Sequence, residues 1–291
     1  VKLMVPGYVG STDARTRFEN EAMAVAKLQS PHVVQVYDFG IQHFVPGSHA
    51  ATDLGCPFIV MELLDGEDLR KRLSRRKRLS ISDAGEIMSQ VGKALSEAHA
   101  AEVIHRDLKP GNIFMVKQRE EELIKVLDFG VAKLSPAAHD TLDADTKDGA
   151  ILGTPQFMAP EQARGVSQVD QRADLWSLGV ILYRALTGQL PYDGINATDV
   201  IVKLCTEPIA RATEVASDLP REVDVFFQRA LARDPNQRFS DARQMAIAFS
   251  RIAPASMPSV SMPMPYALAE AGLQAHPSQA HPSQAHPSQA H

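Results

Sequence analysis

Four polar residues near the middle of the chain have the types and spacing that phosphoryl transfer requires. Asp107 is a carboxylate that can accept a proton, and Lys109 follows it by two residues as a fixed cation. Asn112 and Asp128 offer amide and carboxylate oxygens, the atoms that a hard divalent metal ion such as Mg²⁺ prefers. Phosphoryl transfer depends on positioning and charge stabilisation, so a proton acceptor, a cation and metal ligands are the groups it needs.

The residues around these four give the set its specificity. Residues 105–112 read HRDLKPGN, and residues 128–130 read DFG after two short apolar stretches. Any one of these residues alone could brace a turn or cap a helix. Together and in this order they resemble the catalytic loop and the metal-binding motif of the protein kinase family. The resemblance implies a proton acceptor, a contact to the γ-phosphate of ATP and two Mg²⁺ ligands, in the order Asp107, Lys109, Asn112 and Asp128.

Later segments match the same family in the expected order. Residues 153–161, GTPQFMAPE, resemble the end of an activation segment, in which Thr154 bonds the catalytic Asp and Lys. Residues 174–179, DLWSLG, resemble the start of a central buried helix whose Asp holds the catalytic-loop backbone. Arg238 matches the arginine that pairs with Glu161 in this family.

Lys109 also indicates the acceptor class. In the family that this chain resembles, a lysine two residues after the catalytic Asp goes with serine or threonine acceptors, whereas tyrosine kinases have a different loop. Residues 107–113, DLKPGNI, and residues 153–162, GTPQFMAPEQ, look most like the motifs of the bacterial branch of this family. The resemblance therefore implies a bacterial Ser/Thr protein kinase that transfers the γ-phosphate of ATP to protein hydroxyls.

The first residues resemble the strand that carries the ATP-binding lysine of the family. Lys2 would hold the α- and β-phosphates, and Glu21 would be its ion-pair partner on a helix. The glycine-rich loop that precedes this lysine in the family is absent from the sequence. We therefore expect weak ATP affinity and little turnover from the chain as it stands, and recovery of both in a version extended upstream.

An adenine site is implied by residues at the end of the second predicted strand, together with Phe114. Simple core packing would also explain the apolar members of the set. The ribose contact stays open between Asp65 and Asp68. The implied contacts are Met61 as gatekeeper, Glu62 and Leu63 as hinge backbone, and Phe114 below the base.

The segment between Gly130 and Gly153 is long and polar, which suggests regulation. Arg106 is a cation that a phosphothreonine could order through charge-assisted hydrogen bonds. Thr146 matches the autophosphorylation position of the bacterial branch. The alternative is an ordinary flexible loop.

A run of cations follows the predicted hinge. Residues 70–78 read RKRLSRRKR in a chain whose net charge is −5. The run could recruit acidic substrates or partners. The sequence favours the alternative, the solvated face of a short helix.

Apolar patterns predict the elements that position these residues. Residues 13–28 and the segment from Ser82 onward have helical spacing, and residues 175–186 are apolar nearly all round, as in a helix inside a large lobe. We expect an α+β, two-lobed protein kinase fold, with a small mixed β/α N-lobe that lacks its first strands and a larger mainly helical C-lobe. The predicted strands are 33–39, 57–64, 113–116 and 124–127, the further helices are 197–204, 223–231 and 241–252, and the predicted domains are 1–64, 65–252 and 253–291.

Residues 253–291 have a different composition, rich in Pro, Ser, Ala and His, and end in three His-Pro-Ser-Gln-Ala repeats. They have too little apolar surface to offset their chain entropy, so we expect a disordered linker or tail. The spaced histidines could suggest metal binding, but the proline in each repeat keeps the chain extended.

Composition excludes several other classes of protein. The negative net charge argues against a dedicated nucleic-acid binder, and two distant cysteines give neither a disulfide framework nor a CxxC pair. No apolar run reaches the roughly 18 residues of a membrane span, and no signal peptide opens the chain. We expect a cytoplasmic domain, which a longer protein could anchor in a membrane downstream.

We expect a protein kinase that uses ATP and Mg²⁺ and acts on Ser/Thr hydroxyls of proteins. We also expect it to pair with a second copy for autophosphorylation. Three other functions fit the sequence less well. A pseudokinase scaffold or a catalytically weak fragment is opposed by intact Asp107, Asn112 and Asp128. A small-molecule phosphotransferase is opposed by Lys109 and residues 154–161. A pure binding module would leave the metal ligands unexplained.

Overall fold

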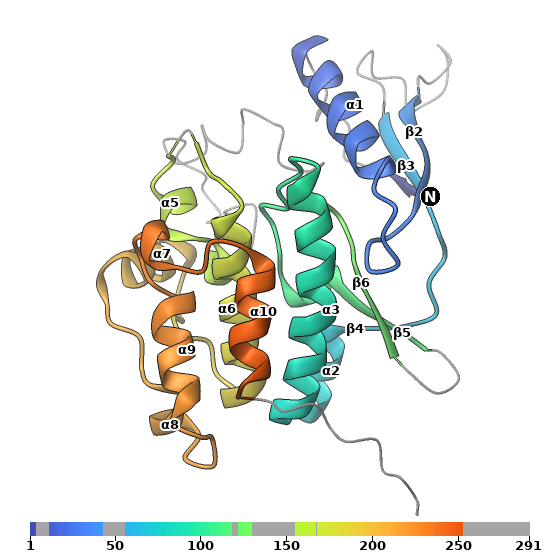
Figure 1. The fold of residues 1–291 in the computed structure, drawn as a ribbon. Coiled ribbons are helices and arrows are strands. Elements are labelled where there is room, and N and C mark those ends of the chain that lie inside the picture. The colour runs from blue at the N-terminus through green and yellow to red at the C-terminus, as the bar shows by residue number, and fades with distance from the viewer. Residues whose placement is uncertain (4–11, 43–55, 118–121, 130–154, 167, 253–291) are drawn as a thin grey trace, which may run out of the picture. The chain divides into compact units, whose positions relative to one another are not determined.

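The structure is a computed structural model that describes residues 1–3, 12–42, 56–117, 122–129, 155–166 and 168–252 (Figure 1). Its contacts divide the chain into residues 1–256 and residues 257–291, and the second unit lies outside the described residues. Residues 43–55, 130–154 and 253–256 lie outside them too. No helix in the described ranges is long and apolar enough to cross a membrane.

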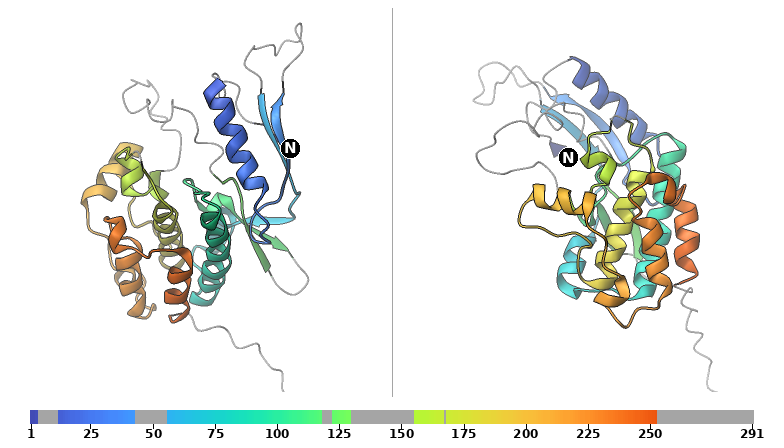
Figure 2. Two further views of the ribbon diagram at one scale, coloured as in Figure 1. Left: turned by 45° about the horizontal axis from the view of Figure 1, so that its top comes forward. Right: turned by 90° about the vertical axis from the view of Figure 1, so that its left-hand side faces the viewer.

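The small lobe contains a three-stranded antiparallel sheet of order β1-β3-β2 with one helix (Figure 2). Helix α1 contacts β2, and its buried residues Phe18, Ala22 and Val25 recur at the spacing of one helix face. The predicted helix 13–28 is confirmed, and the predicted strands 33–39 and 57–64 overlap β2 and β3, which pair antiparallel. The elements are β1 (Lys2–Leu3), α1 (Thr12–Ala26), β2 (Val36–Gln42) and β3 (Cys56–Met61).

The strand predicted from Val33 begins three residues later, for a physical reason. Val33 and Val34 are buried, but Val34 N–H donates to the Val126 carbonyl at 3.0 Å, and Val33 forms a parallel bridge with Val126. Their apolar pattern therefore reflects contact with β6 of the next sheet. This connection joins the segment before β2 to the strand that leads to Asp128.

A second antiparallel sheet, of order β4-β5-β6, flanks the predicted catalytic residues in sequence. Gly66 in β4 has a φ of 152°, and a Cβ there would collide with the Met115 carbonyl oxygen of β5. Glycine is therefore required for the close approach of the two strands. The elements are β4 (Gly66–Asp68), α2 (Leu69–Arg76), β5 (Ile113–Lys117) and β6 (Glu122–Val126).

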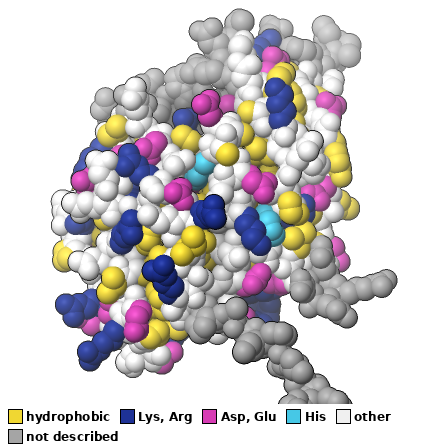
Figure 3. All heavy atoms as spheres, viewed as in Figure 1, with side chains coloured by type: hydrophobic (Ala, Val, Ile, Leu, Met, Phe, Trp, Pro, Cys, Tyr) yellow, Lys and Arg dark blue, Asp and Glu magenta, His cyan; other side chains and the backbone are white. Residues whose placement is uncertain are grey.

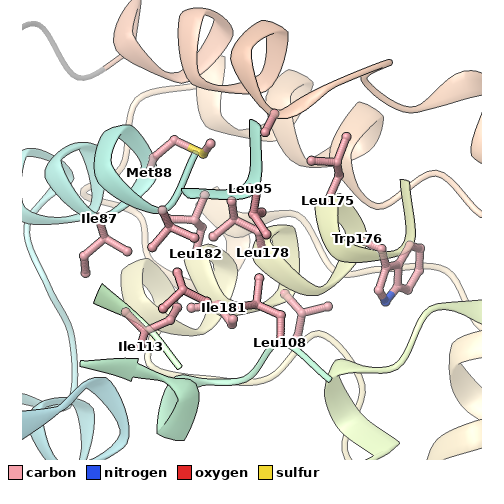
Figure 4. Close-up of a cluster of buried hydrophobic side chains, with 14 of the residues drawn as sticks. Ile87, Met88, Leu95, Leu108, Ile113, Leu175, Trp176, Leu178, Ile181 and Leu182 are labelled. Carbon is pink, nitrogen blue, oxygen red and sulfur yellow. The ribbon is translucent and has the colours of Figure 1, made fainter. Parts of the chain in front are cut away.

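Helix α6 (Arg172–Thr187) is the buried centre of the large lobe, as its apolar sequence predicted. All its residues except Arg172 and Arg184 are buried. Its apolar side chains pack against those of α3 and of the catalytic region, among them Leu108 and Ile113 (Figure 4). Each such side chain contributes about 1.5–3 kcal/mol on burial. The remaining elements are α3 (Ile81–Ala100), η1 (Pro110–Asn112), η2 (Pro155–Phe157), α5 (Pro160–Ala163), α7 (Ala197–Thr206), α8 (Ala212–Val215), α9 (Glu222–Ala230), η3 (Pro235–Gln237) and α10 (Ala242–Ser250).

These elements confirm the predicted α+β class, with a small β-rich lobe and a larger helical lobe. Strand β4 and helices α5 and α8 were not predicted. Each has three or four residues, which is too short to show a hydrophobic period.

Candidate active site

One buried carboxylate holds the catalytic loop. Asp174, in the first turn of α6, accepts the backbone N–H groups of His105 and Arg106, each at 2.8 Å. It also accepts a hydrogen bond from His99 Nε2 at 2.8 Å. Arg106 has a φ of 60°, in the left-handed region that costs a non-glycine residue about 1–2 kcal/mol. The bonds to Asp174 offset this cost, and they confirm the prediction that this Asp anchors the loop.

Asp107 lies directly beside Lys109 and Asn112. Lys109 Nζ donates to Asp107 Oδ2 at 2.8 Å, and Asn112 Nδ2 donates to the Asp107 carbonyl at 2.9 Å. The turn η1 returns the chain, since Asn112 N–H donates to the Lys109 carbonyl at 2.9 Å. The side chains of Asp107 and Lys109 are both partly exposed. A carboxylate and an ammonium group therefore face solvent side by side.

Asp128 is tied to the same loop through its neighbours in sequence. Leu127 N–H donates to the Asn112 carbonyl, and His105 Nε2 donates to the Leu127 carbonyl, both at 2.8 Å. The buried Phe129 ring lies 4.8 Å from the His105 ring, centroid to centroid. The structure thus brings Asn112 and the backbone next to Asp128 into contact, although 15 residues separate Asn112 from Leu127.

Lys2 reaches this region from the small lobe. Its Nζ atom lies 2.7 Å from Asp128 Oδ2, with 45% of the Lys2 side chain and 30% of the Asp128 side chain exposed. Lys2 is held in β1 opposite Ile59 of β3. The predicted partner, Glu21, is half-buried on α1, and its pairing with Lys2 stays a prediction.

The donor chemistry of Asn112 and Asp128 fits Mg²⁺. The amide nitrogen of Asn112 is engaged with Asp107, so the amide oxygen is the atom left for a metal. The Asp128 carboxylate already holds a cation, the Lys2 ammonium group. Mg²⁺ usually keeps several waters and binds one or two protein ligands plus phosphates, so this pair suffices. The described ranges contain no cluster of three His, Cys, Asp or Glu side chains that could form a separate metal site.

The residues predicted to surround adenine lie at the end of β3, directly after it, or in β5. Met61 and Phe114 are half-buried, and Leu63 is fully exposed. The Asp65 carbonyl accepts the N–H of Lys117, and its side chain is exposed. Asp68 caps α2 by accepting the Lys71 N–H at 2.8 Å. The choice between Asp65 and Asp68 for the ribose therefore stays open.

The hinge residue Glu62 has contacts that the sequence did not predict. Its Oε1 atom accepts the backbone N–H of Gln35 and the ammonium group of Lys125, both at 2.7 Å. The Glu62 N–H donates to the Gln35 carbonyl at 3.0 Å. Lys125 is 11% exposed in its side chain, so this contact is largely shielded from water. It links the hinge to the segment before β2 and to β6.

The segment around α5 is locked to the large lobe by Glu161 and Arg238. Two guanidinium nitrogens of Arg238 donate to the two carboxylate oxygens of Glu161, each at 2.7 Å, and the Arg238 side chain has no exposed surface. This confirms the predicted ion pair. Gln162 Nε2 donates to the Arg106 carbonyl at 3.0 Å, which connects α5 to the catalytic loop. The sequence did not reveal this second contact.

Two predicted residues, Thr154 and Thr146, lie outside the described residues. Arg106, the proposed phosphate-binding cation, is exposed. The sequence also missed His99, which bonds Asp174 from the last turn of α3. A histidine at the end of a predicted helix, six residues before His105, was the available signal.

Comparisons with known proteins agree with this geometry. Residues 5–249 match the family described as protein kinase domain. The chain is 42% identical over 236 residues to the serine/threonine-protein kinase pkn3 of Myxococcus xanthus, with 79% of this chain and 41% of the relative covered. It is 36% identical over 237 residues to the serine/threonine-protein kinase PknB of Mycolicibacterium smegmatis, covering 81% of this chain and 36% of the relative.

A third relative and a solved structure extend the comparison. The serine/threonine-protein kinase PknL of Mycobacterium tuberculosis is 34% identical over 266 residues, with 91% of this chain and 62% of the relative covered. The crystal structure of the M. tuberculosis PknI kinase domain matches with a TM-score of 0.64 and 26% identity, covering 87% of this chain and 84% of that chain. The chain spans 36% to 62% of the length of the three curated relatives. It belongs to the protein kinase domain family, among the bacterial serine/threonine-protein kinases.

Proposed function

We propose that the chain is the catalytic part of a protein serine/threonine kinase that transfers the γ-phosphate of ATP to Ser or Thr hydroxyls of proteins. The observation that carries this proposal is the contact of Asp107 with both Lys109 and Asn112, at 2.8 and 2.9 Å. The same loop is bonded to Leu127, the residue before Asp128. The proposed proton acceptor, the cation and one proposed metal ligand therefore lie on one loop, and the second proposed metal ligand follows the residue bonded to that loop.

In the proposed reaction, Asp107 orients the acceptor hydroxyl and takes its proton as the oxygen attacks phosphorus. Lys109, 2.8 Å from Asp107, stabilises the γ-phosphoryl oxygens. Thr154 would bond both side chains and complete the acceptor site. The bond that breaks joins the γ-phosphorus to the bridging oxygen, and ADP leaves.

Asn112 and Asp128 would hold Mg²⁺, which supplies charge neutralisation at the phosphates. Lys2, paired with Glu21, would position the α- and β-phosphates. In the structure Lys2 contacts Asp128, so nucleotide binding requires this ammonium group to turn toward phosphate oxygens. The proposed ATP contacts are Lys2, Glu21, Met61, Glu62, Leu63, Asp65 and Phe114.

Regulation in this proposal centres on Arg106 and Thr146. Phosphate on Thr146 would form charge-assisted hydrogen bonds with the exposed Arg106 guanidinium. A second copy of the kinase would supply that phosphate. We place the domain in the cytoplasm, with residues 1–64 and 65–252 as its two lobes and residues 253–291 as a linker.

The test is transfer of labelled phosphate from ATP in the presence of Mg²⁺, using the complete protein that the gene encodes. We expect labelling of the protein itself and of a generic acceptor such as casein. Asp107→Asn should remove the label while leaving ATP binding intact, because Asp107 acts on the acceptor. A protein that labels nothing, or an Asp107→Asn variant with full activity, contradicts the proposal.

A further inference from the structure

Helix α2 presents cations to solvent on one face. Leu69 and Leu73 are buried, so the opposite face of α2 points outward. The side chains of Arg70 and Arg75 are 73% and 60% exposed, and Lys71 is exposed as well. We call these three residues the α2 cationic surface. Cations and carboxylates are interspersed on the face shown in Figure 3, whereas residues 70–78 hold seven cations in nine positions.

Three of the other four cations of this run have side-chain partners, and the fourth, the exposed Lys77, ends α2 through its backbone. Arg72 makes a two-pronged contact with Glu122 of β6 and also contacts Glu67. These contacts raise the pKa of Arg72 and lower the pKa of Glu67, chiefly through the hydrogen bond in each case. Arg76 pairs with Asp83. Arg78 is bound by the Leu186 carbonyl and Asp218.

The cations of the α2 cationic surface have fewer ion-pair partners than Arg72, Arg76 and Arg78. Arg70 reaches Asp68 only at 3.5 Å. Lys71 has no ion pair among the described residues. Arg75 contacts the Glu67 carboxylate, which it shares with Arg72, and Arg72 is also paired with Glu122. The surface therefore keeps a net positive charge that a partner can use.

This surface lies next to the catalytic loop. Asp68, the residue before α2, pairs in register with Phe114, two residues after Asn112. Helix α2 also contacts the turn η1, which begins directly after Lys109. Arg70 and Lys71 stand in the first turn of the helix, two and three residues after Asp68. An acceptor segment that extends from Asp107 past η1 to the start of α2 would therefore meet these cations.

The chain itself contains an acceptor segment of opposite charge. Residues 139–150 read HDTLDADTKDGA, with four aspartates against one lysine, and include Thr141 and Thr146. We propose that the α2 cationic surface selects acceptor segments flanked by carboxylates, and that its occupant is residues 139–150 of a second copy of this chain. This inference rests on the proposed kinase activity and names the substrate class of that site.

The first experiment measures kcat/KM for two peptides with the complete protein. One peptide has the sequence of residues 139–150, and the other has its four aspartates replaced by asparagine. We expect Arg70→Gln/Lys71→Gln to lower kcat/KM for the acidic peptide about three- to tenfold, since exposed ion pairs are individually weak. The same variant should leave the neutral peptide unchanged, which shows that folding and basal chemistry are intact.

A matched control removes two exposed cations elsewhere. Arg221→Gln/Arg243→Gln changes the net charge equally, at the N-terminus of α9 and on α10. It should leave both peptides unchanged. The preference for the acidic peptide should shrink between about 0.05 M and about 0.3 M salt, because exposed charges are screened over about 10 Å at 0.1 M. Equal rates for the two peptides, or equal effects of the two double variants, overturn the inference.

The second experiment tests the second copy directly. An Asp107→Asn copy serves as an inert acceptor, and an active copy serves as the enzyme, with mass spectrometry of residues 139–150 of the acceptor. Arg70→Gln/Lys71→Gln should slow labelling when it is in the enzyme copy and not when it is in the acceptor copy. The reverse result shows contact within one chain and overturns the inference. If the unaltered enzyme labels neither the acceptor copy nor casein, the proposed kinase activity itself fails.

Discussion

The ammonium group of Lys2 lies 2.7 Å from the Asp128 carboxylate, which joins the first strand of the small lobe to the motif expected to bind metal. Two groups that should both meet ATP thus neutralise each other in the structure. A carboxylate that is engaged with an ammonium group is a weaker ligand for a divalent cation. The Lys2–Asp128 contact therefore competes with metal binding when no nucleotide is present.

Replacing Lys2 should strengthen metal binding in the absence of nucleotide. We expect Lys2→Met to tighten Mn²⁺ binding, measured by electron paramagnetic resonance, about two- to fivefold, because a partly exposed ion pair is worth at most about 1 kcal/mol. The same variant should raise the KM for ATP, because it removes a phosphate contact. Lys27→Met, at an exposed lysine just after α1, is the control and should change neither quantity. Weaker Mn²⁺ binding in Lys2→Met would mean that the lysine does not compete for the carboxylate.

Lys109 should affect the chemical step more than nucleotide binding. Its Nζ atom contacts Asp107, and in the proposed reaction it stabilises the γ-phosphoryl oxygens. We expect Lys109→Met to lower kcat about 10²-fold, the size of effect seen when one stabilising group is removed from a transition state. The KM for ATP should change by less than about threefold, since the lost contact acts mainly in the transition state. Steady-state kinetics with Lys117→Met as the control separates these effects, and a change confined to KM would assign Lys109 to binding instead.

Local sequence was sufficient for the catalytic loop and the central helix. The motif HRDLKPGN predicted Asp107, Lys109 and Asn112 as site residues. The three lie within six residues, and the short turn η1 brings Asn112 back toward Lys109. Helix α6 was predicted because its residues are apolar on all sides, a pattern that only a buried helix explains. The Glu161–Arg238 pair was predicted although 77 positions separate the residues, because both belong to known motifs.

Contacts between distant segments without such motifs could not be predicted. Whether Lys2 meets Asp128 or Glu21 depends on how β1 sits against the segment after β6, which periodicity does not report. Val33 looked like part of a strand because its apolar side chain is buried against β6. The contact of Glu62 with Lys125 could not be predicted, because in the sequence each residue looks like an ordinary exposed charge. Only the fold brings the two side chains together.

Arg238 should not be replaceable by lysine. All five of its N–H donors are used: two on the Glu161 carboxylate and one each on the carbonyls of Ala232, Arg172 and Arg233. Lysine has three donors and no planar fork, so it leaves buried acceptors without partners. We expect Arg238→Lys to lower the free energy of unfolding by about 2–4 kcal/mol, measured by urea denaturation.

The control for this variant is Arg221→Lys, which removes a guanidinium fork at an exposed arginine just before α9. It should cost less than about 0.5 kcal/mol, as surface substitutions usually do. An Arg238→Lys variant as stable as the unaltered protein would show that the carbonyls find other donors.

Asp174 should support both the fold and the rate. Its two oxygens accept three donors, from His99, His105 and Arg106, and the side chain has no exposed surface. Asparagine offers one carbonyl oxygen, and its NH₂ group would face at least one of these N–H donors. We expect Asp174→Asn to lower the free energy of unfolding by about 3–5 kcal/mol, because it breaks a buried charged network.

The rate should fall further than this loss of stability explains. Arg106 has a positive φ that the bonds to Asp174 maintain, and Asp107 follows it directly. Measured at a temperature where circular dichroism shows the variant folded, kcat should be reduced about 10²-fold, since small displacements of a catalytic group are costly. Asp218→Asn, at an exposed aspartate paired with Arg78, should leave kcat unchanged. A folded Asp174→Asn variant with normal kcat would show that the catalytic loop keeps its conformation without this carboxylate.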